Sequence, residues 1–417
     1  PDATQAENPT WAGYDWLMVD TAVRLAHARG FRILLTVVYA PQWAQDGAVS
    51  AGTHPGSWQP DPTALGEFAT AVGRRYSGAT PDPGNPGRML PRVDAFQGWN
   101  EPNLAYYLSP QWATQNGQLV NVAAGWYRSM LNSLYAGVKQ AQPNALVVAA
   151  GMSPYGDYPL GGVRTPPALF WRDLLCLQSD LSPAPCPDPA HFDVVDSHPY
   201  DIKGPLHPAV LADDLTMPDI GKIRRMVTTA EAHQTALPGG PKQYWATEFS
   251  WESSPPDPSA VPAARQARWL EEGIYELWSQ GVSVISWFLI NDQPPVPDYR
   301  STYQSGLFGL DGAPKPATTA YRFPFVVVCP TMIAPGMRVS CLAWGKAPAR
   351  SVMIERLVRG RWHRVLAPRS GPDGVFEARL RLTQGAILRA FSRPSFRSAG
   401  TVNLSLNWRI NPLQDGT

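Results

Sequence analysis

Cysteine, charge and long apolar runs are all scarce in this chain of 417 residues. Four cysteines are too few for a disulfide-built scaffold, so a hydrophobic core must hold the fold. No run of 18 apolar residues occurs, which excludes a membrane-spanning helix. Charged residues make up only 17% of the chain, and no nucleic-acid recognition motif accompanies them. The sequence therefore predicts a globular protein with neither a membrane span nor a nucleic-acid partner.

Proline is abundant and charge is unevenly divided. The 44 prolines indicate many ordered loops. The formal net charge is +1, yet residues 323–417 hold 14 Lys and Arg against four acids, so an acidic body precedes a basic C-terminal module. Such a module could contact an anionic glycan or the cell envelope. We favour the alternative that these arginines lie singly on solvated strand faces, because they are scattered along the sequence.

The four cysteines form two local pairs, Cys176 with Cys186 and Cys329 with Cys341. Neither pair has the C-x₂-C spacing of a zinc site, and the sequence predicts no metal and no organic cofactor. Short-range pairing in Pro-rich loops or between adjacent strands suits two disulfides, and hence a secreted or extracytoplasmic protein. Four buried free thiols are the alternative.

Helical and strand patterns alternate over the first 320 or so residues. This alternation predicts parallel strands with helices outside them. An open doubly wound sheet is disfavoured, because no Gly-rich phosphate turn follows a strand. The expected helices span residues 14–29, 62–76, 124–140, 167–175, 220–233 and 262–280, and the expected strands span 31–39, 93–100, 145–151, 192–198, 243–249 and 282–290.

Polar and aromatic residues gather at the ends of nearly all these strands, which is where a (β/α)8 TIM barrel builds its active site. We therefore expect a catalytic α/β barrel over residues 1–322. From residue 323 to 417 no helical period remains, and short strand-like runs alternate with turns. One turn, Val358-Arg359-Gly360-Arg361-Trp362, is typical of a hairpin. This C-terminal domain is expected to be an all-β sandwich.

Two glutamates follow buried strands. Glu101 lies in Trp99-Asn100-Glu101-Pro102, and Glu248 lies in Trp245-Ala246-Thr247-Glu248. Burying a carboxyl group at such a position costs desolvation free energy unless hydrogen-bond or charged partners compensate for it. A glutamate there therefore indicates a functional role. Two of them on one barrel rim match the cleavage of glycosidic bonds, in which one carboxylic acid protonates the leaving oxygen and the other carboxylate attacks the sugar or activates water.

Both segments resemble the signatures of clan A retaining glycoside hydrolases, in which Asn-Glu-Pro ends barrel strand four and a second Glu ends strand seven. Val195-Asp196-Ser197-His198-Pro199-Tyr200 is similar to strand six, most of all in glycoside hydrolase family 39 and the family 5 cellulase-like enzymes. The resemblance covers residues 14 to 322. It implies that Glu101 is the acid/base and Glu248 the nucleophile, and that the reactive subsite is lined by Asn100, His198, Tyr200 and Trp287.

Strands one and two of such a barrel have no counterpart here, since only about ten residues precede the first expected helix. We expect that an omitted N-terminal segment or a second polypeptide completes the barrel. A six-stranded barrel is the weaker alternative, because eight strands fit the interior packing.

Three further residues are weaker candidates for substrate binding: Trp43 and Trp251 could stack on sugar rings, and Asn291 could bind a hydroxyl. The predicted activity is retaining hydrolysis of oligosaccharides, polysaccharides or glycosides. A transglycosylase with the same residues and a non-catalytic carbohydrate-binding barrel are the alternatives.

Overall fold

The computed structural model describes residues 3–47, 49–330, 338–347, 350–382, 386–392, 396–397 and 402–404. The chain divides into two compact units. Unit 1 comprises Pro1–Pro199 and Ala209–Thr247, and unit 2 comprises Tyr200–Pro208 and Glu248–Thr417. The division predicted between residues 322 and 323 stays a prediction.

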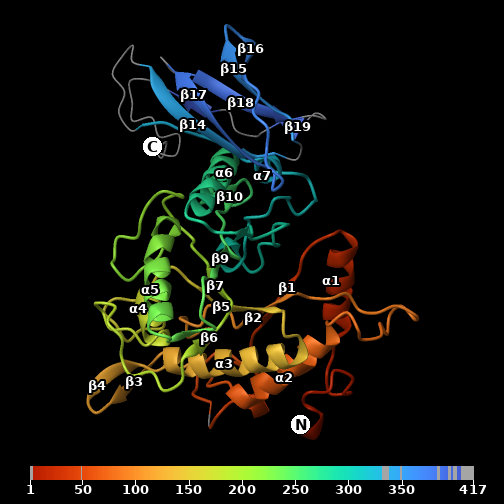
Figure 1. Ribbon diagram of the computed structural model, residues 1–417, viewed down its shortest axis with the longest axis vertical. Helices are drawn as coiled ribbons and strands as arrows, with labels where there is room; N and C mark the ends of the chain where they lie inside the picture. Colours follow the sequence, from red (N-terminus) through yellow and green to blue (C-terminus); the bar gives the residue numbers. More distant parts are fainter. Residues whose placement is uncertain are drawn as a thin grey trace. The chain divides into compact units, whose positions relative to one another are not determined.

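A parallel β-sheet forms the centre of unit 1 (Figure 1). Its strands pair in the order β1 (Leu34–Val37), β2 (Ala95–Gly98), β5 (Leu146–Met152), β7 (Val194–Ser197) and β9 (Gln243–Ala246). All residues of β2 and β7 are buried, as expected for strands covered on both faces. This is the sheet of half a parallel barrel. Because its strands run the same way, the loops that follow them leave from one edge.

Helices precede or follow these strands, close to the predicted positions. They are α1 (Leu17–Ala28), α2 (Pro62–Arg75), α3 (Ala123–Ala141), α4 (Pro167–Leu174) and α5 (Ile220–Ala232). The start of α2 shows why the sequence folds this way. The Asp61 carboxylate accepts the backbone N–H of Thr63 at 2.7 Å, and Pro62 fills the first helical position, where no N–H is needed.

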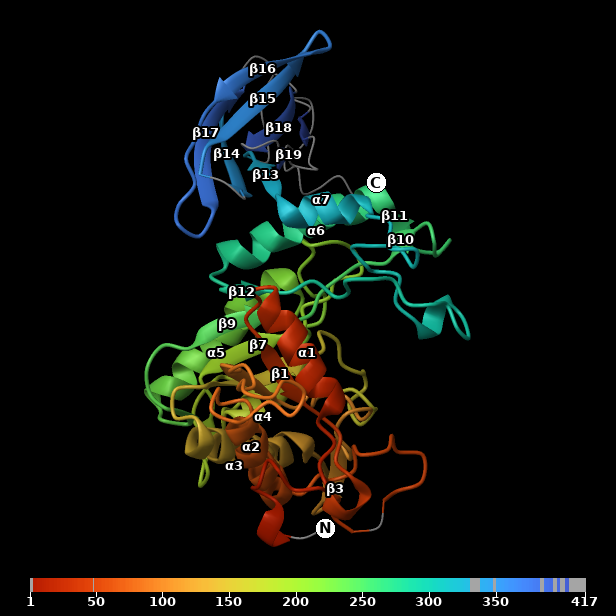
Figure 2. The same cartoon turned by 90° about the vertical axis from the view of Figure 1, so that its right-hand side faces the viewer.

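Helices α2 and α3 lie side by side in both views (Figure 2). Their contact depends on two glycines, because a Cβ on Gly137 would lie 2.2 Å from the carbonyl oxygen of Gly66. Thr70 uses the same close approach, and its hydroxyl donates to the Gly137 carbonyl at 3.4 Å. A side chain at either glycine would push the two helices apart.

A buried ion pair joins α1 to α2. The Arg75 guanidinium donates to both carboxylate oxygens of Asp20, at 2.9 and 2.6 Å, and the Tyr76 hydroxyl donates to the same carboxylate at 2.9 Å. Because each charge has its partners, the group tolerates burial, and it fixes the position of α1. Burial raises the pKa of Tyr76, and the hydrogen bond to Asp20 and the Asp20 charge add to this.

Unit 2 begins with short elements and continues as two antiparallel sheets. Its first part holds β10 (Ser253–Ser254), β11 (Val261–Pro262), α6 (Ala263–Ser279), β12 (Val284–Ile285) and α7 (Pro316–Arg322). One sheet pairs β13 (Phe325–Val328), β14 (Val339–Lys346) and β17 (Val375–Leu382). The other pairs β16 (Arg361–Leu366), β15 (Val352–Val358), β18 (Ala386–Ser392) and β19 (Phe396–Arg397), with β20 (Val402–Leu404) also beside β18.

A single hydrophobic cluster joins residues of both sheets, among them Phe325, Ile354, Phe376, Leu380 and Leu388. Alternate residues of β18 are buried, which is the pattern of a strand with one face toward a core. The predicted hairpin connects β15 to β16, and Arg359 and Gly360 have φ values of 49° and 79°. Two positive φ angles are what a two-residue hairpin turn requires.

Two disulfides are present, Cys176–Cys186 in unit 1 and Cys329–Cys341 in unit 2. In unit 2 the bridge ties the residue after β13 to the middle of β14, and both of its cysteines are buried. In the part of the chain that the structure describes, no helix is long and apolar enough to cross a membrane.

A hairpin of β3 (Trp112–Gln115) and β4 (Gln118–Asn121) was not predicted from the sequence, although its turn, Asn116-Gly117, is a strong hairpin signal. The short pair β6 (Ala190–His191) and β8 (Ala236–Leu237) was not predicted either. Of residues 398–417, the structure describes β20, and the remaining positions lie outside the described residues.

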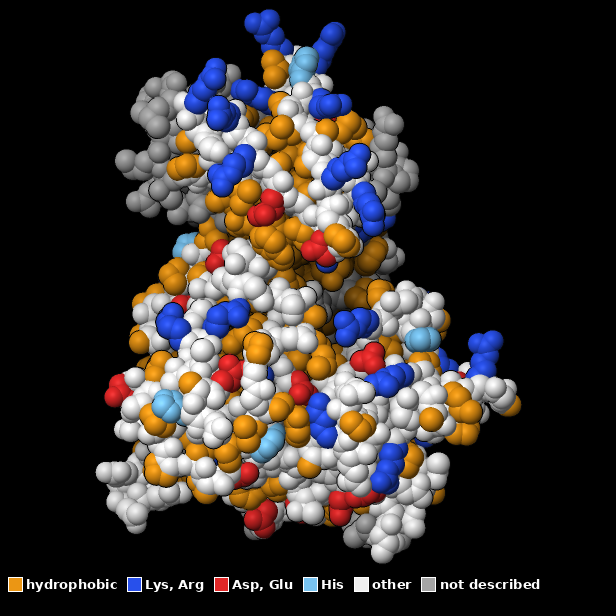
Figure 3. Space-filling model, viewed as in Figure 1, with side chains coloured by type: hydrophobic (Ala, Val, Ile, Leu, Met, Phe, Trp, Pro, Cys, Tyr) orange, Lys and Arg blue, Asp and Glu red, His pale blue; other side chains and the backbone are white. Residues whose placement is uncertain are grey.

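Basic side chains of the C-terminal sheets stand apart from one another over the upper part of Figure 3. Exposed examples occur on β16 and β17, namely Arg361, Arg364, Arg379 and Arg381. Arg389 is different, because it pairs with Glu355 at 2.7 Å and its guanidinium lies 4.0 Å from the centre of the Trp362 ring. This scatter agrees with arginines on solvated strand faces, and the contact with an anionic glycan or envelope stays a prediction.

Candidate active site

Glu101 lies in a tightly held loop after β2. Trp99 and Glu101 both have positive φ, 71° and 37°, which side chains with a Cβ rarely adopt. Three bonds hold the loop: the Trp99 N–H donates to Val37 at 3.0 Å, its indole N–H donates to Tyr107 at 2.7 Å, and the Glu101 N–H donates to Gly151 at 3.2 Å. Unusual backbone geometry fixed by its surroundings is typical of functional positions.

The loop is also tied down at its far end by Asn103, which is fully buried. Its amide donates to the carbonyls of Ser153 and Thr165, at 3.0 and 3.1 Å, and accepts the Ser153 N–H at 3.1 Å. Asn100, predicted as a sugar ligand, is half-buried between Trp99 and Glu101. Thus Asn103 has a structural task, and the role of Asn100 stays a prediction.

His198 contacts the Glu101 carboxyl. The His198 Nδ1 lies 3.1 Å from the Glu101 Oε1, and its Nε2 lies 3.1 Å from the Thr247 hydroxyl oxygen. His198 is 1% exposed, whereas the Glu101 side chain retains 13% exposure. The imidazole is therefore held at both nitrogens in a dry position, and Glu101 is its partner nearer to solvent.

The hydrogen bonds continue from Thr247 to Asp196, which is completely buried. Its carboxylate accepts the Thr247 N–H at 3.0 Å and the Gln97 amide at 3.1 Å, and it also accepts the Thr247 hydroxyl. Thr36 donates to the Gln97 oxygen at 3.0 Å, which fixes the orientation of that amide. We call the residues Thr36, Gln97, Asp196, Thr247, His198 and Glu101 the polar chain.

The polar chain determines where hydrogens lie. Because the Thr247 hydroxyl donates to Asp196, its oxygen can only accept from His198, so the Nε2 of His198 carries a hydrogen. One further hydrogen then joins Nδ1 to the Glu101 carboxyl, as a neutral carboxylic acid beside imidazole or as a carboxylate beside imidazolium. Glu101 is thus coupled to a group that can share its proton.

A bulge in β5 makes room for the polar chain. The pairing of β5 with β7 shifts between Ala150 and Met152, and Ala150 and Gly151 have φ values of 78° and 53°. A Cβ on Gly151 would lie 2.4 Å from the Gln97 amide nitrogen, 2.8 Å from the His198 Nε2 and 2.9 Å from an Asp196 oxygen. Only glycine fits here, and the sequence analysis did not single it out.

Tyrosines form a second feature beside Glu101 that the sequence analysis missed. Tyr39 stacks on Tyr107 with ring centres 5.7 Å apart, and His54 lies between Tyr39 and Tyr106 at 4.6 and 4.0 Å. Burial raises the pKa of the Tyr39 hydroxyl, and the neighbouring tyrosines and the charge of Glu101 add to this. Tyr106 is 55% exposed, so this aromatic group is open to a ligand.

Glu248 and Tyr200 belong to unit 2. The Tyr200 hydroxyl donates to the Glu248 Oε2 at 3.0 Å. Glu248 directly follows Thr247 of the polar chain, and the peptide bond fixes their Cα atoms about 3.8 Å apart. Because β2 and β9 are parallel strands of the sheet in unit 1, Glu101 and Thr247 follow strands that end at the same edge.

The other predicted sugar contacts lie in varied surroundings. Trp251 and Trp287 are only 6% and 7% exposed, with ring centres 6.1 Å apart, and the indole N–H of Trp287 donates to Ser305 at 2.8 Å. Trp43 is 55% exposed after β1, and Asn291 is exposed. The structure brings none of these into the polar chain, and their contacts with substrate stay predictions.

Glu252 is half-buried in unit 2. Burial raises its pKa to about 7, and a hydrogen bond and repulsion from Asp257 add to this. Because a pKa near neutrality is also expected of a catalytic acid, Glu252, four residues after Glu248, is an alternative candidate for that role. A substitution of Glu252 is therefore used below as a control for the roles proposed for Glu101 and Glu248.

The sequence matches no protein-family model. No curated protein matches it either. Solved structures that resemble the chain include a glucosidase from Croceicoccus marinus, with 12% identity, a TM-score of 0.49, and coverage of 90% of this chain and 81% of that one. Xylanase 10B from Thermotoga maritima has 15% identity and a TM-score of 0.41, and the match covers 76% of this chain and 81% of the xylanase. A Paenibacillus polymyxa xyloglucanase from glycoside hydrolase family 44 has 11% identity and a TM-score of 0.41, covering 89% and 82%. Likeness at this level assigns this chain to none of their families, and the resemblance to families 39 and 5 stays a prediction.

Proposed function

We propose that the protein is a retaining glycoside hydrolase of the clan A type, with Glu101 as the acid/base and Glu248 as the nucleophile. The observation that carries this proposal is the polar chain, which couples the Glu101 carboxyl to a buried imidazole at the edge where the parallel strands end. A general acid needs a proton near neutral pH, and a partner that can share it supports that role.

The reaction would proceed by double displacement. Glu101 gives its proton to the glycosidic oxygen while a Glu248 oxygen attacks the anomeric carbon, so the bond to the leaving group breaks as a glycosyl ester forms. Water then attacks the ester, Glu101 takes up its proton, and Glu248 is released as carboxylate. The proposal requires carboxyl groups about 5–5.5 Å apart in the working enzyme.

The contacts of each carboxyl suit its proposed role. Tyr200 donates a hydrogen bond to one oxygen of Glu248, which orients the carboxylate for the attack. His198 can take up or return the Glu101 proton as the charge on that carboxyl changes through the cycle. The exposed Tyr106 and its neighbour His54 are suited to stack on a sugar bound beside Glu101.

We also propose a secreted or extracytoplasmic location, because two disulfides need an oxidising compartment to form and persist. Such a compartment is where a polysaccharide substrate is accessible.

A screen of nitrophenyl glycosides tests the activity, and a 2-fluoro sugar of the best substrate tests the nucleophile. Mass analysis of peptides should find the trapped sugar on Glu248. Glu248→Gln should abolish turnover, and Glu101→Ala should regain part of its rate with azide, which replaces water and needs no base.

Glu252→Gln is the matched control, because it removes a neighbouring carboxyl whose pKa is raised to about 7 without touching either proposed catalytic group. It should keep turnover near the parent level. Full activity in Glu248→Gln, or a sugar adduct on Glu252, would reject the assignment. Binding of glycans without turnover of any aryl glycoside would favour a carbohydrate-binding barrel instead.

A further inference from the structure

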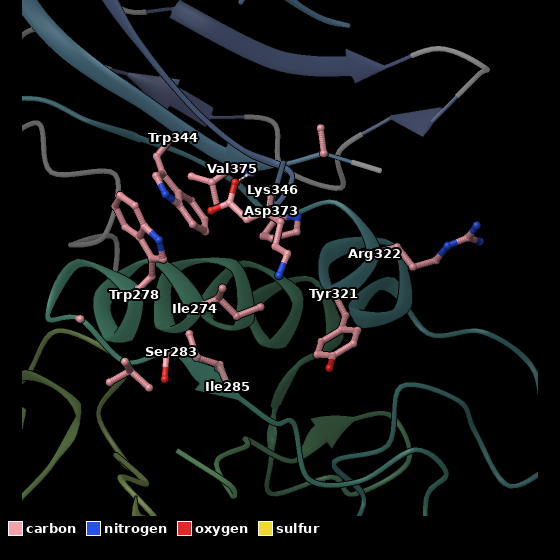
Figure 4. Close-up of a pocket in the computed structure, with 14 residues that line it drawn as sticks. Ile274, Trp278, Ser283, Ile285, Tyr321, Arg322, Trp344, Lys346, Asp373 and Val375 are labelled. Atoms are coloured by element: carbon pink, nitrogen blue, oxygen red, sulfur yellow. Dashed lines mark hydrogen bonds between the residues drawn. The ribbon is translucent and has the colours of Figure 1, made fainter. Parts of the chain in front are cut away.

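Unit 2 contains a cavity of about 600 Å³, within the size range of small-molecule sites. The C-terminal turn of α6 and the segment leading into β12 form one side, and the outer face of β14 with the start of β17 forms the other (Figure 4). Its floor is apolar, with Ile274, Ile285 and Val375 among its residues. None of its lining residues belongs to the polar chain or is a proposed catalytic group.

Aromatic rings form one wall. Trp278 of α6 lies beside Trp344 of β14, with ring centres 5.3 Å apart (Figure 4). Tyr275 packs against both rings, with its centre 5.4 Å from that of Trp344 and 6.2 Å from that of Trp278. Trp278 is half-buried, so part of its indole remains open. A flat, partly open indole in a cavity is suited to stack on the apolar face of a sugar ring.

The Trp344 indole belongs to the lining of the cavity. Trp344 is 1% exposed, and its Nε1 has no hydrogen-bond partner among the described residues. Buried N–H groups are nearly always paired, so an orphan beside a cavity points to an acceptor that a ligand would supply. The hydroxyl oxygens of a carbohydrate are such acceptors.

Two side chains of opposite charge add polar contacts. Lys346 reaches from β14 toward α6, and within the described residues its ammonium group makes no ion pair (Figure 4). The Asp373 carboxylate accepts the Val375 N–H at 3.1 Å, which leaves its second oxygen for other donors. Arg322 extends away from the other side chains drawn. The charges of Lys346 and Asp373 therefore balance, which favours a neutral ligand.

We propose that this cavity is a second carbohydrate-binding site, which holds a residue of a neutral polysaccharide with side chains other than the proposed catalytic groups. Stacking on Trp278 supplies the apolar contact, and Lys346, Asp373 and the Trp344 N–H supply hydrogen bonds to hydroxyl groups. Arg379 and Arg381 lie on the same face of β17 as Val375, farther from the cavity. An acidic polysaccharide is therefore the competing ligand, and the test must distinguish it from a neutral one.

The test is a calorimetric titration of the full chain with cellohexaose, xylohexaose and mannohexaose, and with a galacturonate hexamer as the acidic probe. We expect at least one neutral probe to bind, and Trp278→Ala to weaken that binding about tenfold. Lys346→Ala is the second variant, because this exposed side chain makes no ion pair with any residue that the structure describes, and its loss should leave the fold intact. It should also weaken the binding.

Trp362→Ala is the matched control, since it removes a half-buried indole from the same unit outside the cavity. Its affinity should equal that of the parent. The proposal is wrong if no neutral probe binds, if Trp278→Ala and Lys346→Ala bind as the parent does, or if only the galacturonate hexamer binds. Mass analysis of each probe after titration shows whether it was cleaved, so failure of this site is distinguished from failure of the proposed catalysis.

Discussion

Replacing Gly151 by alanine should disable the proposed active site without touching a catalytic group. The added Cβ would lie 2.4 Å from the Gln97 amide nitrogen, 2.8 Å from the His198 Nε2 and 2.9 Å from an Asp196 oxygen. An ordinary contact is longer by about 1 Å, and all three neighbours are fixed by other hydrogen bonds. We therefore expect His198 to move relative to Glu101.

The expected effect on catalysis is large. A displacement of about 1 Å at catalytic groups can lower the rate about 10²-fold, which corresponds to about 2.7 kcal/mol of lost transition-state stabilisation. The φ of 53° adds a separate cost, because alanine in this region is strained by about 1–2 kcal/mol. Overpacking should add about 1–3 kcal/mol to the loss of stability.

Gly117→Ala is a matched control for the backbone term. Gly117 has a φ of 77°, and its Cβ would have nothing within 4 Å. Alanine there should lower the free energy of unfolding by about 1 kcal/mol and leave catalysis unchanged. The assays are urea unfolding and kcat/KM on the aryl glycoside identified by the screen. A folded Gly151→Ala protein with the kcat/KM of Gly117→Ala would refute the role given to the polar chain.

Three other changes test separate parts of the structure. Burial raises the pKa of Glu252 to about 7, above the ordinary value of 4.5. The contribution of this group to stability is therefore full below pH 4.5 and is lost as the pH rises to 7. Glu252→Gln should abolish that loss, as measured by urea unfolding from pH 4 to 8. Thr247→Val should lower kcat about tenfold, because it removes the hydroxyl that contacts the His198 Nε2. Thr247→Ser keeps a hydroxyl and should retain most of the parent kcat. Equal kcat values for the two variants would show that the hydroxyl is dispensable. Asp20→Ala leaves Arg75 buried without its carboxylate and should lower the free energy of unfolding by about 3 kcal/mol; a loss under about 1 kcal/mol in the same assay would mean that the pair contributes little.

Local sequence patterns predicted the order of elements well. The sequence predicted a strand around both β2 and β7, which are buried throughout although each also carries a polar side chain of the site. The helices could be located because their apolar periodicity and end signals, such as Asp61-Pro62 before α2, are written in neighbouring residues. The hairpin at Asn116-Gly117 was not predicted, although its turn signal also lies in neighbouring residues.

The sequence by itself also determined which glutamates to consider, because Glu101 and Glu248 each follow a strand and stand in motifs that resemble known signatures. Only the tertiary structure decided what surrounds Glu101. Gln97, Asp196, Thr247 and His198 come from three different strands and their loops, and no spacing along the chain reveals that they form one row of hydrogen bonds. The need for glycine at position 151 has the same origin: the space beside its Cα is filled by side chains that are 45 to 54 residues away in sequence and meet only when parallel strands pair.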